Sequence, residues 1–467
     1  MQTHLKSSAN SVMRDDSYEK RNCGSLFSPA VHELDGLRGG GNSVPHSDPA
    51  SAGAADLTVY YTPGNPDVQA MVTRFQRDNP ALTVEALAFE DAASLDSRLS
   101  DESEEGSGPD VVLFSDAAAL DTQQMAAAGD FADLAPLLAG DASYSPEDYF
   151  PLLDAGRIGE RQFFLPLRFR IHYLISSREK LESEGLSLPS PYSMPQLMER
   201  MEAAAENNPN DTSGLQILSQ WTPGGLLYDV LRLSGIPVLD WEGQRVDLSQ
   251  KECLLYAAYA RSCVEQVRKS EELLKPYQHD FIGAFSKLTF FMTKSQLAYT
   301  ARQYDAIFAQ GLEQEMCLLP YTSFDGSGIV GDVTLYAAIL ERSSHRELAY
   351  DFLRSAMDSP MSAADPLSGD FSVSRPQVSA LLDALAAGNG KSMSIGAKRV
   401  LIPALSPQRR EEIQAILDQV QSGSIRNAAL EKILARSMQP YLEETGDFSA
   451  CYAEMTQQLE AHLQDKP

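Results

Sequence analysis

One stretch, residues 56–89, constrains the fold of this chain more than any other. It opens with apolar residues that alternate with other residues, a pattern that favours a β-strand. The tetrapeptide 62–65 has the composition of a turn, and a helix with a regularly spaced apolar face is predicted from Pro66. Asn79–Pro80 ends that helix, and residues 82–89 favour a second strand. The stretch therefore predicts a βαβ unit.

A third predicted strand follows at Val111–Phe114. It is short and wholly apolar, which is typical of a parallel strand buried on both faces. In parallel sheets, ligands bind beyond the carboxyl ends of the strands. In this chain those ends are Tyr61–Asn65 and Ser115–Asp116. The sequence thus predicts an α/β fold with a ligand-binding edge at these residues.

Short segments along the whole chain stand in a familiar order and spacing. They are Tyr60–Asn65, Phe75–Pro80, Gly108–Val112, Phe131–Leu134, Phe164–Leu167, Ile175–Leu181, Leu319–Pro320, Gly331–Asp332 and Glu347–Leu353. In these segments the chain resembles the bacterial extracellular solute-binding proteins of family 1, the sugar-binding subunits of ABC importers, similar to maltose-binding protein. The resemblance implies a two-lobed α/β fold of the periplasmic-binding-protein type (type II), with discontinuous lobes joined by hinge strands.

The length of the chain agrees with two lobes, because 467 residues exceed what one hydrophobic core usually holds. The first lobe is expected to comprise residues 56–167 plus 296–343. The second is expected to comprise residues 168–295 plus 344–467. Residues 1–55 are rich in Gly, Ser, Pro and charge and are expected to form a disordered tail or linker.

Residues 162–177 form one long strand-like run interrupted by Pro166, which suggests a strand that leaves one sheet and enters another. In the resembling family this run is the first hinge crossing. Further crossings are expected near residues 294–300 and 341–346. Strand-like segments at 296–300, 316–319 and 333–340 are expected to return to the first lobe.

The formal net charge of −27 argues against nucleic acid or an anionic membrane surface as a partner, because phosphate binding needs a basic surface. The five cysteines predict no disulfide framework. Cys253 and Cys263 lie too far apart on one predicted helix to be bridged, and Cys317 is expected to be a small core residue.

Cys23 and the Gly-, Ser- and Ala-rich stretch after it have the layout of a lipoprotein anchor and its tether. The residues before Cys23 are charged and do not form the apolar run that an export signal requires. Three alternatives stay open: the sequence begins at a different place, its leader is replaced or truncated, or the protein is not exported. No run of 18 apolar residues predicts a transmembrane helix.

Two glycine-rich motifs are rejected as nucleotide sites. Gly326–Gly331 matches the dinucleotide fingerprint, but a β-branched, strand-like run follows where that motif requires a helix. Gly390–Ser392 resembles the end of a phosphate loop, but Leu385 stands where that loop needs its first glycine. The spacing of the remaining residues suggests no metal site, no hydrolase motif and no cofactor.

Aromatic side chains are better candidates for a binding site, because sugar rings stack on flat aromatic rings. The hydroxyls of the sugar then bond to Asp, Asn, Gln and Arg side chains nearby. Trp221 precedes a glycine-rich helix start, whereas Trp241 lies in a hairpin turn and is expected at the surface. Other candidates lie on segments that line the cleft in the resembling family. The full set of candidate ligand-binding residues is Tyr60, Tyr61, Asp116, Arg168, Tyr173, Trp221 and Tyr304.

Each candidate also has a purely structural alternative. The aromatic residues can pack in the core, Asp116 can cap a helix, and Arg168 can form a surface ion pair.

The expected function is therefore binding rather than catalysis. The resemblance implies a monomeric extracytoplasmic protein that captures a carbohydrate-like solute between its lobes and delivers it to ABC permease subunits. Two alternatives stay open: a carbohydrate-active hydrolase with a carboxylate pair in its cleft, and a non-transport receptor or interaction module.

Overall fold

The structure is a computed structural model of the chain. It describes residues 55–62, 67–105, 107–116, 120–183, 192–207, 215–217, 221–277, 280–287, 290–293, 297–361, 370–388, 390–395 and 398–464. The predicted tail, apart from residue 55, lies outside these residues.

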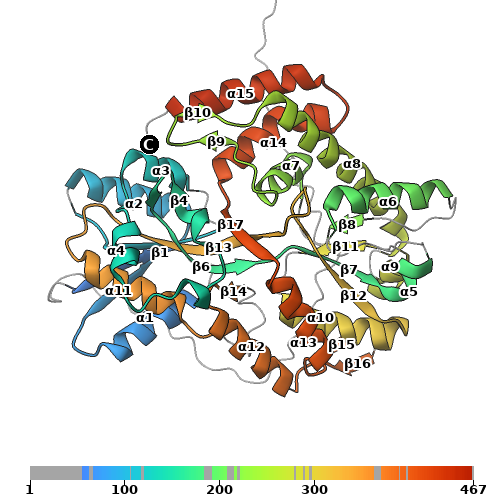
Figure 1. Cartoon of the computed structure of the whole chain (residues 1–467), viewed down its shortest axis with the longest axis horizontal. Helices are drawn as coiled ribbons and strands as arrows, with labels where there is room; N and C mark the ends of the chain where they lie inside the picture. Colours follow the sequence, from blue (N-terminus) through green and yellow to red (C-terminus); the bar gives the residue numbers. More distant parts are fainter. Residues whose placement is uncertain are drawn as a thin grey trace, which may run out of the picture.

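A seven-stranded sheet organises one half of the molecule (Figure 1). Its order is β14 (Phe371–Ser372), β6 (Leu165–Arg170), β13 (Ile329–Ile339), β3 (Val111–Ser115), β1 (Leu57–Tyr61) and β2 (Val84–Ala88), and β17 (Val420–Ile425) also pairs with β13. Strand β1 is parallel to β2 and β3, and α1 (Asp67–Asp78) buries its regularly spaced apolar face. The βαβ unit predicted from the sequence is therefore confirmed.

A four-stranded sheet organises the other half. Its order is β12 (Met316–Pro320), β7 (Tyr173–Ser177), β11 (Phe290–Thr293) and β8 (Leu215–Ile217). An apolar core surrounds it, built mainly from α6 (Met194–Asn207), α7 (Pro223–Arg232), α8 (Gln250–Leu274), α14 (Ala428–Leu442) and α15 (Phe448–Gln464). Figure 1 shows the two sheets side by side, with β17 running between the two halves.

The remaining elements cover the sheets or connect them. The helices are α2 (Ala92–Glu105), α3 (Thr122–Ala128), α4 (Ala135–Gly140), α5 (Arg178–Ser183), α9 (Phe281–Lys287), α10 (Leu297–Ile307), α11 (Arg346–Met357), α12 (Arg375–Ala387) and α13 (Pro407–Leu417). Single 3-10 or π turns span Pro146–Asp148, Leu153–Gly156, Lys275–Tyr277 and Phe308–Leu312. Three hairpins pair β4 (Arg157–Ile158) with β5 (Arg161–Gln162), β9 (Leu239–Asp240) with β10 (Arg245–Val246), and β15 (Ser392–Ile395) with β16 (Lys398–Leu401).

The chain changes sheets between β6 and β7, within the run that the sequence predicted to cross. Strand β6 ends at Arg170 in the seven-stranded sheet, and β7 begins at Tyr173 in the four-stranded sheet. Strands β1, β3 and β13 share one sheet, whereas Ile175 on β7 lies in the other.

Two of the three segments that were predicted to return to the first lobe do not return to it. The segment predicted as a strand at 296–300 contains the start of α10 (Leu297–Ile307). This helix is buried on nearly all sides, so its residues show no one-sided apolar pattern that would mark it as a helix. Strand β12 forms as predicted, but it pairs with β7 in the four-stranded sheet. The return to the seven-stranded sheet therefore comes after Pro320, where the chain leads into β13.

The crossing predicted at 341–346 is also wrong. Helix α11, which follows, stays with the first sheet: its Phe352 ring lies edge-on to Phe75 of α1, with centroids 5.3 Å apart. The chain crosses later, between β14 and α13, where Arg409 of α13 donates to Asp305 of α10 at 2.7 Å and to the carbonyl of Met316 in β12 at 2.9 Å. It then returns to the first sheet in β17, which pairs with β13, and crosses again into α14 of the second core. The lobe boundaries given above otherwise stay a prediction.

Candidate functional site

Polar residues gather where the two sheets meet. Strands β1, β3 and β6 all end at this junction, as the parallel pairing of β1 with β3 requires. Strand β13 runs antiparallel to β3, with Leu335 opposite Ser115. Because Asp332 precedes Leu335 by three residues, it lies beyond the end of β3, opposite Arg170 of β6.

Asp332 is the centre of a buried charge network, which we call the junction network. Its carboxylate accepts hydrogen bonds from Arg170 Nε at 3.2 Å and from Arg232 Nη1 at 2.5 Å, and it lies 3.1 Å from His172 Nε2. Arg232 stands at the end of α7 and also donates to Asp229 Oδ1 at 2.9 Å. The network thus joins the strands of the first sheet to a helix of the second core.

The electrostatics of the network follow from burial and pairing. Asp332 is only 3% exposed, and burial alone would raise its pKa, but the charges of Arg232, Arg170 and His172 outweigh burial and hold the pKa well below its ordinary value. Burial likewise opposes the charge of Arg232, and Asp332 and Asp229 overcome that penalty and raise its pKa. Both groups are therefore charged inside the protein.

The outer side of the junction is partly exposed. Arg170 forms a second ion pair, with Asp116 just past the end of β3. Thr62 and Ser115, at the ends of β1 and β3, are buried behind this edge and hold their hydroxyl oxygens 3.3 Å apart. The carboxylate of Asp116 and the guanidinium of Arg170 form a hydrogen-bonding pair that suits a polyhydroxylated solute.

Asp370 contributes a further carboxylate close to these charges. Burial, the largest effect, raises its pKa; the positive charge of Arg170 lowers it, and the negative charges of Asp332 and Asp67 raise it again. The protonated form of Asp370 is therefore favoured more than for an ordinary aspartate.

Four of the predicted ligand-binding residues lie inside the protein. Tyr60 donates its hydroxyl to Glu102 Oε1 at 2.8 Å, and the fully buried Arg168 donates Nε to Asp67 Oδ2 at 2.8 Å. Tyr173 is fully buried, and Tyr304 is nearly so, with a pKa raised chiefly by burial.

The other three predicted residues are partly exposed: Tyr61, Asp116 and Trp221. The first two share the junction edge, where Tyr61 donates its hydroxyl to Gln69 Oε1 at 3.2 Å. Trp221 packs on the second core and donates Nε1 to Glu271 Oε1 at 3.1 Å. Trp221 precedes α7, whereas Arg232 is the last residue of that ten-residue helix, about 14 Å from its first residue at 1.5 Å per residue, so the structure does not bring Trp221 to the junction network.

The sequence interpretation missed the network residues on β13 and α7. A signal for Asp332 was present, because it is the one charged residue within the apolar strand β13. A carboxylate in such a strand must find cationic partners to be buried. The sequence did not identify Arg232 as a partner, because it is the last residue of α7, three residues after Asp229, and this pair resembles an ordinary ion pair at a solvated helix end.

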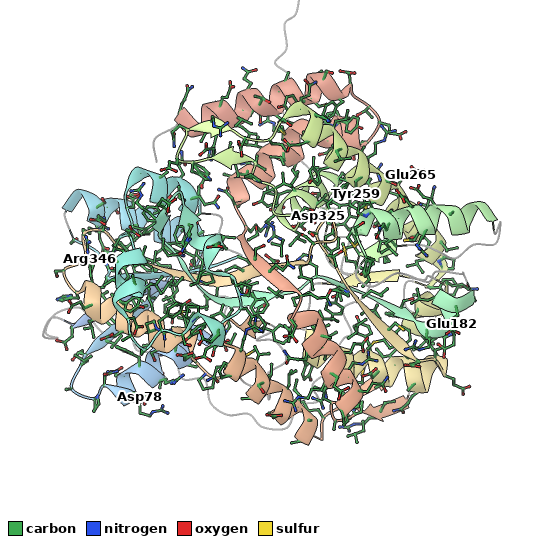
Figure 2. The ribbon with its side chains drawn as sticks, viewed as in Figure 1. Asp78, Glu182, Tyr259, Glu265, Asp325 and Arg346 are labelled. Atoms are coloured by element: carbon green, nitrogen blue, oxygen red, sulfur yellow. The ribbon has the colours of Figure 1, made fainter. Side chains whose placement is uncertain are left out.

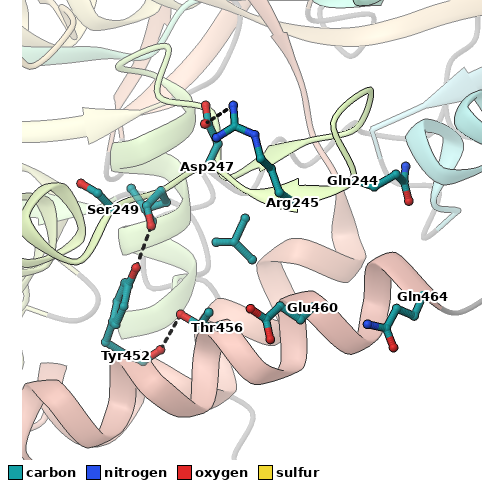
Figure 3. Close-up of a pocket in the computed structure, with 10 residues that line it drawn as sticks. Gln244, Arg245, Asp247, Ser249, Tyr452, Thr456, Glu460 and Gln464 are labelled. Carbon is teal, nitrogen blue, oxygen red and sulfur yellow. Dashed lines mark hydrogen bonds and ion pairs between the residues drawn. The ribbon is translucent and has the colours of Figure 1, made fainter.

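A separate pocket of about 500 Å³ lies between β10 and α15, on the second core (Figure 3). Its polar groups largely satisfy one another. Arg245 donates Nε to Asp240 Oδ2 at 3.0 Å and pairs with Asp247 at 3.3 Å, and Tyr452 donates its hydroxyl to the carbonyl of Leu248 at 2.9 Å. We therefore place the candidate site at the junction and not in this pocket.

Within the part of the chain that the structure describes, no three His, Cys, Asp or Glu side chains are placed to hold a metal ion together. The same residues include no helix with the length and apolar character needed to cross a membrane.

Comparisons with known proteins bear on the fold. No family model matches the chain. No curated protein matches it either.

Solved structures do match, over most of the chain. The sugar-binding protein MalE of Xanthomonas citri is similar with a TM-score of 0.58 and 14% identity, over 87% of this chain and 97% of that one. A sugar transporter of Rhizobium etli in an open conformation gives 0.57 and 15%, over 87% and 99%. An extracellular solute-binding protein of family 1 from Alicyclobacillus acidocaldarius gives 0.52 and 14%, over 88% and 98%.

At these identities the likeness shows the fold. The two-lobed α/β architecture of periplasmic binding proteins, expected from the sequence, is confirmed, and the matching structures are of the type that the sequence resembles.

Proposed function

We propose that this protein is an extracytoplasmic solute-binding protein that captures a carbohydrate-like solute between its lobes and delivers it to the permease of an ABC transporter. The observation that carries the proposal is the junction, where the chain changes sheets and charged and hydroxyl groups gather at the strand ends. The similar structures, which are named as sugar- or solute-binding proteins, support it.

The mechanism is binding and hinge closure, without chemistry. The two halves are joined by the crossings between β6 and β7, between β12 and β13, between β14 and α13, and before and after β17. Rotation about such connections opens and closes the space between lobes in proteins of this architecture. A solute held there is shielded from water until the permease accepts it.

The solute contacts in this proposal are the partly exposed groups of the junction edge. Tyr61 offers an aromatic face, and Asp116 and Arg170 offer charged hydrogen-bonding groups that already orient each other. Trp221 is retained as a contact from the second lobe. The four buried candidates act in this proposal only by supporting the residues around them.

A thermal-shift screen across sugars, polyamines and peptides tests the function. A solute that binds only the folded state stabilises it by about 2.7 kcal/mol at 100 times its dissociation constant, which melting detects easily. Product formation during the assay would instead identify a hydrolase.

The Asp116→Asn variant tests the place of the site. Loss of a charged hydrogen-bond acceptor costs roughly 1.5–3 kcal/mol of binding, so affinity for the solute found in the screen falls by about one to two orders of magnitude. Glu315→Gln is the control, because Glu315 forms an exposed ion pair with Arg178. Equal affinity in both variants would move the site away from Asp116.

The proposal places the protein outside the cytoplasmic membrane, tethered through a leader and a lipidated cysteine. Fractionation of the native cells tests this location. Recovery in the cytosolic fraction would contradict the transport function even if a solute binds.

A further inference from the structure

One carboxylate of the first lobe, that of Asp121, contacts two helices of the second core. Asp121 caps α3, accepting from the backbone N–H of Gln124 at 3.1 Å. Its Oδ1 also accepts from Asn427 Nδ2, the N-cap residue of α14, at 2.8 Å. Its Oδ2 lies 2.6 Å from Nε2 of His462, near the end of α15. Asp121 therefore joins the two halves through side chains alone.

The contact between the Asp121 carboxylate and the His462 imidazole is sheltered from water, because their side chains are only 13% and 14% exposed. Gln124 strengthens the same contact by donating Nε2 to the carbonyl of His462 at 3.1 Å.

Trp241 adds an apolar contact at the same place. The sequence predicted a hairpin turn with this residue at the surface, and the turn between β9 and β10 does form. The indole, however, is partly buried and packs against both the second core and the cluster of the first lobe that contains Phe163 and Phe164. Its ring also lies edge-on to His462, with centroids 6.0 Å apart. The surface prediction is corrected because the neighbouring lobe covers this residue.

These contacts and the hinge strands affect the angle between the lobes differently. The hinge strands connect the lobes covalently and leave the angle between them free to change. The contacts of His462 with Asp121 and with Trp241 fix that angle. They can break without unfolding either core, because the three residues come from three separate elements. Figure 1 shows α3 and β4 of the first half beside the β9–β10 hairpin and α15.

We propose that Asp121, Trp241 and His462 form a latch that holds the two lobes in the present arrangement without any solute. Separation of the lobes on this side breaks the contact between Asp121 and His462 and exposes the indole. The latch thus sets the ratio of latched to separated molecules before solute binds. The inference concerns the solute-free protein, so it stands or falls independently of the transport function.

The test measures the distance between the lobes in the full chain without solute. Spin labels at Asp78→Cys and Glu265→Cys lie on opposite halves of the molecule (Figure 2), and both native side chains are exposed. Cys23 and Cys317 are replaced by Ser, and the three remaining cysteines are buried. Double electron–electron resonance then reports the distribution of distances between the labels.

The perturbing variants are His462→Ala, Trp241→Ala and Asp121→Asn. The asparagine keeps a capping oxygen and an acceptor for Asn427, and removes only the charge facing His462. We expect each variant to broaden the distribution and to raise the ratio of separated to latched molecules by about tenfold, the factor that corresponds to 1.4 kcal/mol.

His345→Ala is the matched control. His345 also pairs with an aspartate, Asp110, at 3.2 Å, but both residues lie in the first lobe. This variant should leave the distribution unchanged.

Two outcomes would overturn the latch. One is an unchanged distribution in His462→Ala and Asp121→Asn while circular dichroism shows both variants folded. The other is an equal change in His345→Ala, which would indicate general loosening. If Trp241→Ala fails to fold, the two polar variants still decide the matter.

Discussion

Replacing Asp332 by Asn would show how strongly the junction network stabilises the fold. The substitution keeps the shape of the side chain and removes the charge that Arg170, His172 and Arg232 face. Removing one partner of a buried ion pair costs about 3–5 kcal/mol, because the other charge stays buried without compensation. Asp229 remains 2.9 Å from Arg232, so we expect the lower end, about 3 kcal/mol.

That loss is measurable by calorimetry and by urea unfolding. For unfolding of one lobe of about 150–250 residues as a unit, 1 kcal/mol corresponds to about 2–4 °C in Tm, so that lobe of the variant should melt roughly 6–12 °C lower. The dependence of the unfolding free energy on urea concentration should stay the same, because the surface exposed on unfolding does not change. The control is Glu315→Gln, which removes an exposed carboxylate and should cost less than about 1 kcal/mol.

The pH dependence of the unfolding free energy gives a second test of the stabilising charge on Asp332. The pKa of Asp332 is lowered in the folded protein, so its stabilisation is fully present above its unfolded pKa of about 3.9 and is lost as pH falls through the folded pKa. The difference in unfolding free energy between the natural protein and the variant should therefore shrink by about 1 kcal/mol from pH 5 to pH 3. A total loss below about 1 kcal/mol, or a difference that does not shrink, would refute the assignment of a stabilising charge to Asp332.

Two further predictions concern packing and thiols. A Cβ added at Gly224 would lie 2.1 Å from Cα of Ala435, so Gly224→Ala should push α7 from α14 and cost about 1–3 kcal/mol in urea unfolding, whereas Gly140→Ala, with open space around it, should cost almost nothing. Iodoacetamide should modify Cys317 of the folded protein before Cys253, because Cys317 is partly exposed whereas Cys253 is buried. Burial raises the pKa of both thiols, that of Cys253 to about 12. Peptide mass spectrometry that finds the reverse order would contradict the described burial.

The sequence predicted those parts of the fold whose cause is local. The apolar face of α1, the buried β3 and the crossing after β6 each follow from a pattern within a few residues of the element itself. The strand prediction at 296–300 was wrong because its pattern is equally local. Leu297, Ala298 and Tyr299 form a short apolar run that suits a buried strand and a buried helix alike, and only the packing of α10 against the core selects the helix.

The candidate site was harder to predict, because its side chains depend on contacts between distant segments. Arg168 lies on the predicted crossing, but whether it faces solute or core is decided by Asp67, about a hundred residues earlier in the chain. The surroundings of Trp241, in the other lobe, could not be predicted for the same reason. Its hairpin was predictable, whereas the surface that covers it belongs to a lobe whose position no local pattern specifies.

The partners of Asp332 come from both halves of the molecule, so the contacts of this residue depend on how the two sheets meet. These partners come from the end of β6, from the crossing that follows it and from α7 of the second core. A buried carboxylate is tolerated only where cationic partners reach it, and this set is complete only when both sheets meet in this register. Displacing α7 would remove Arg232 from Asp332, so less positive charge would offset the burial of the Asp332 carboxylate. The network therefore opposes changes at the junction, and movement between the lobes is expected to take place around it, at the contacts farther from the crossings.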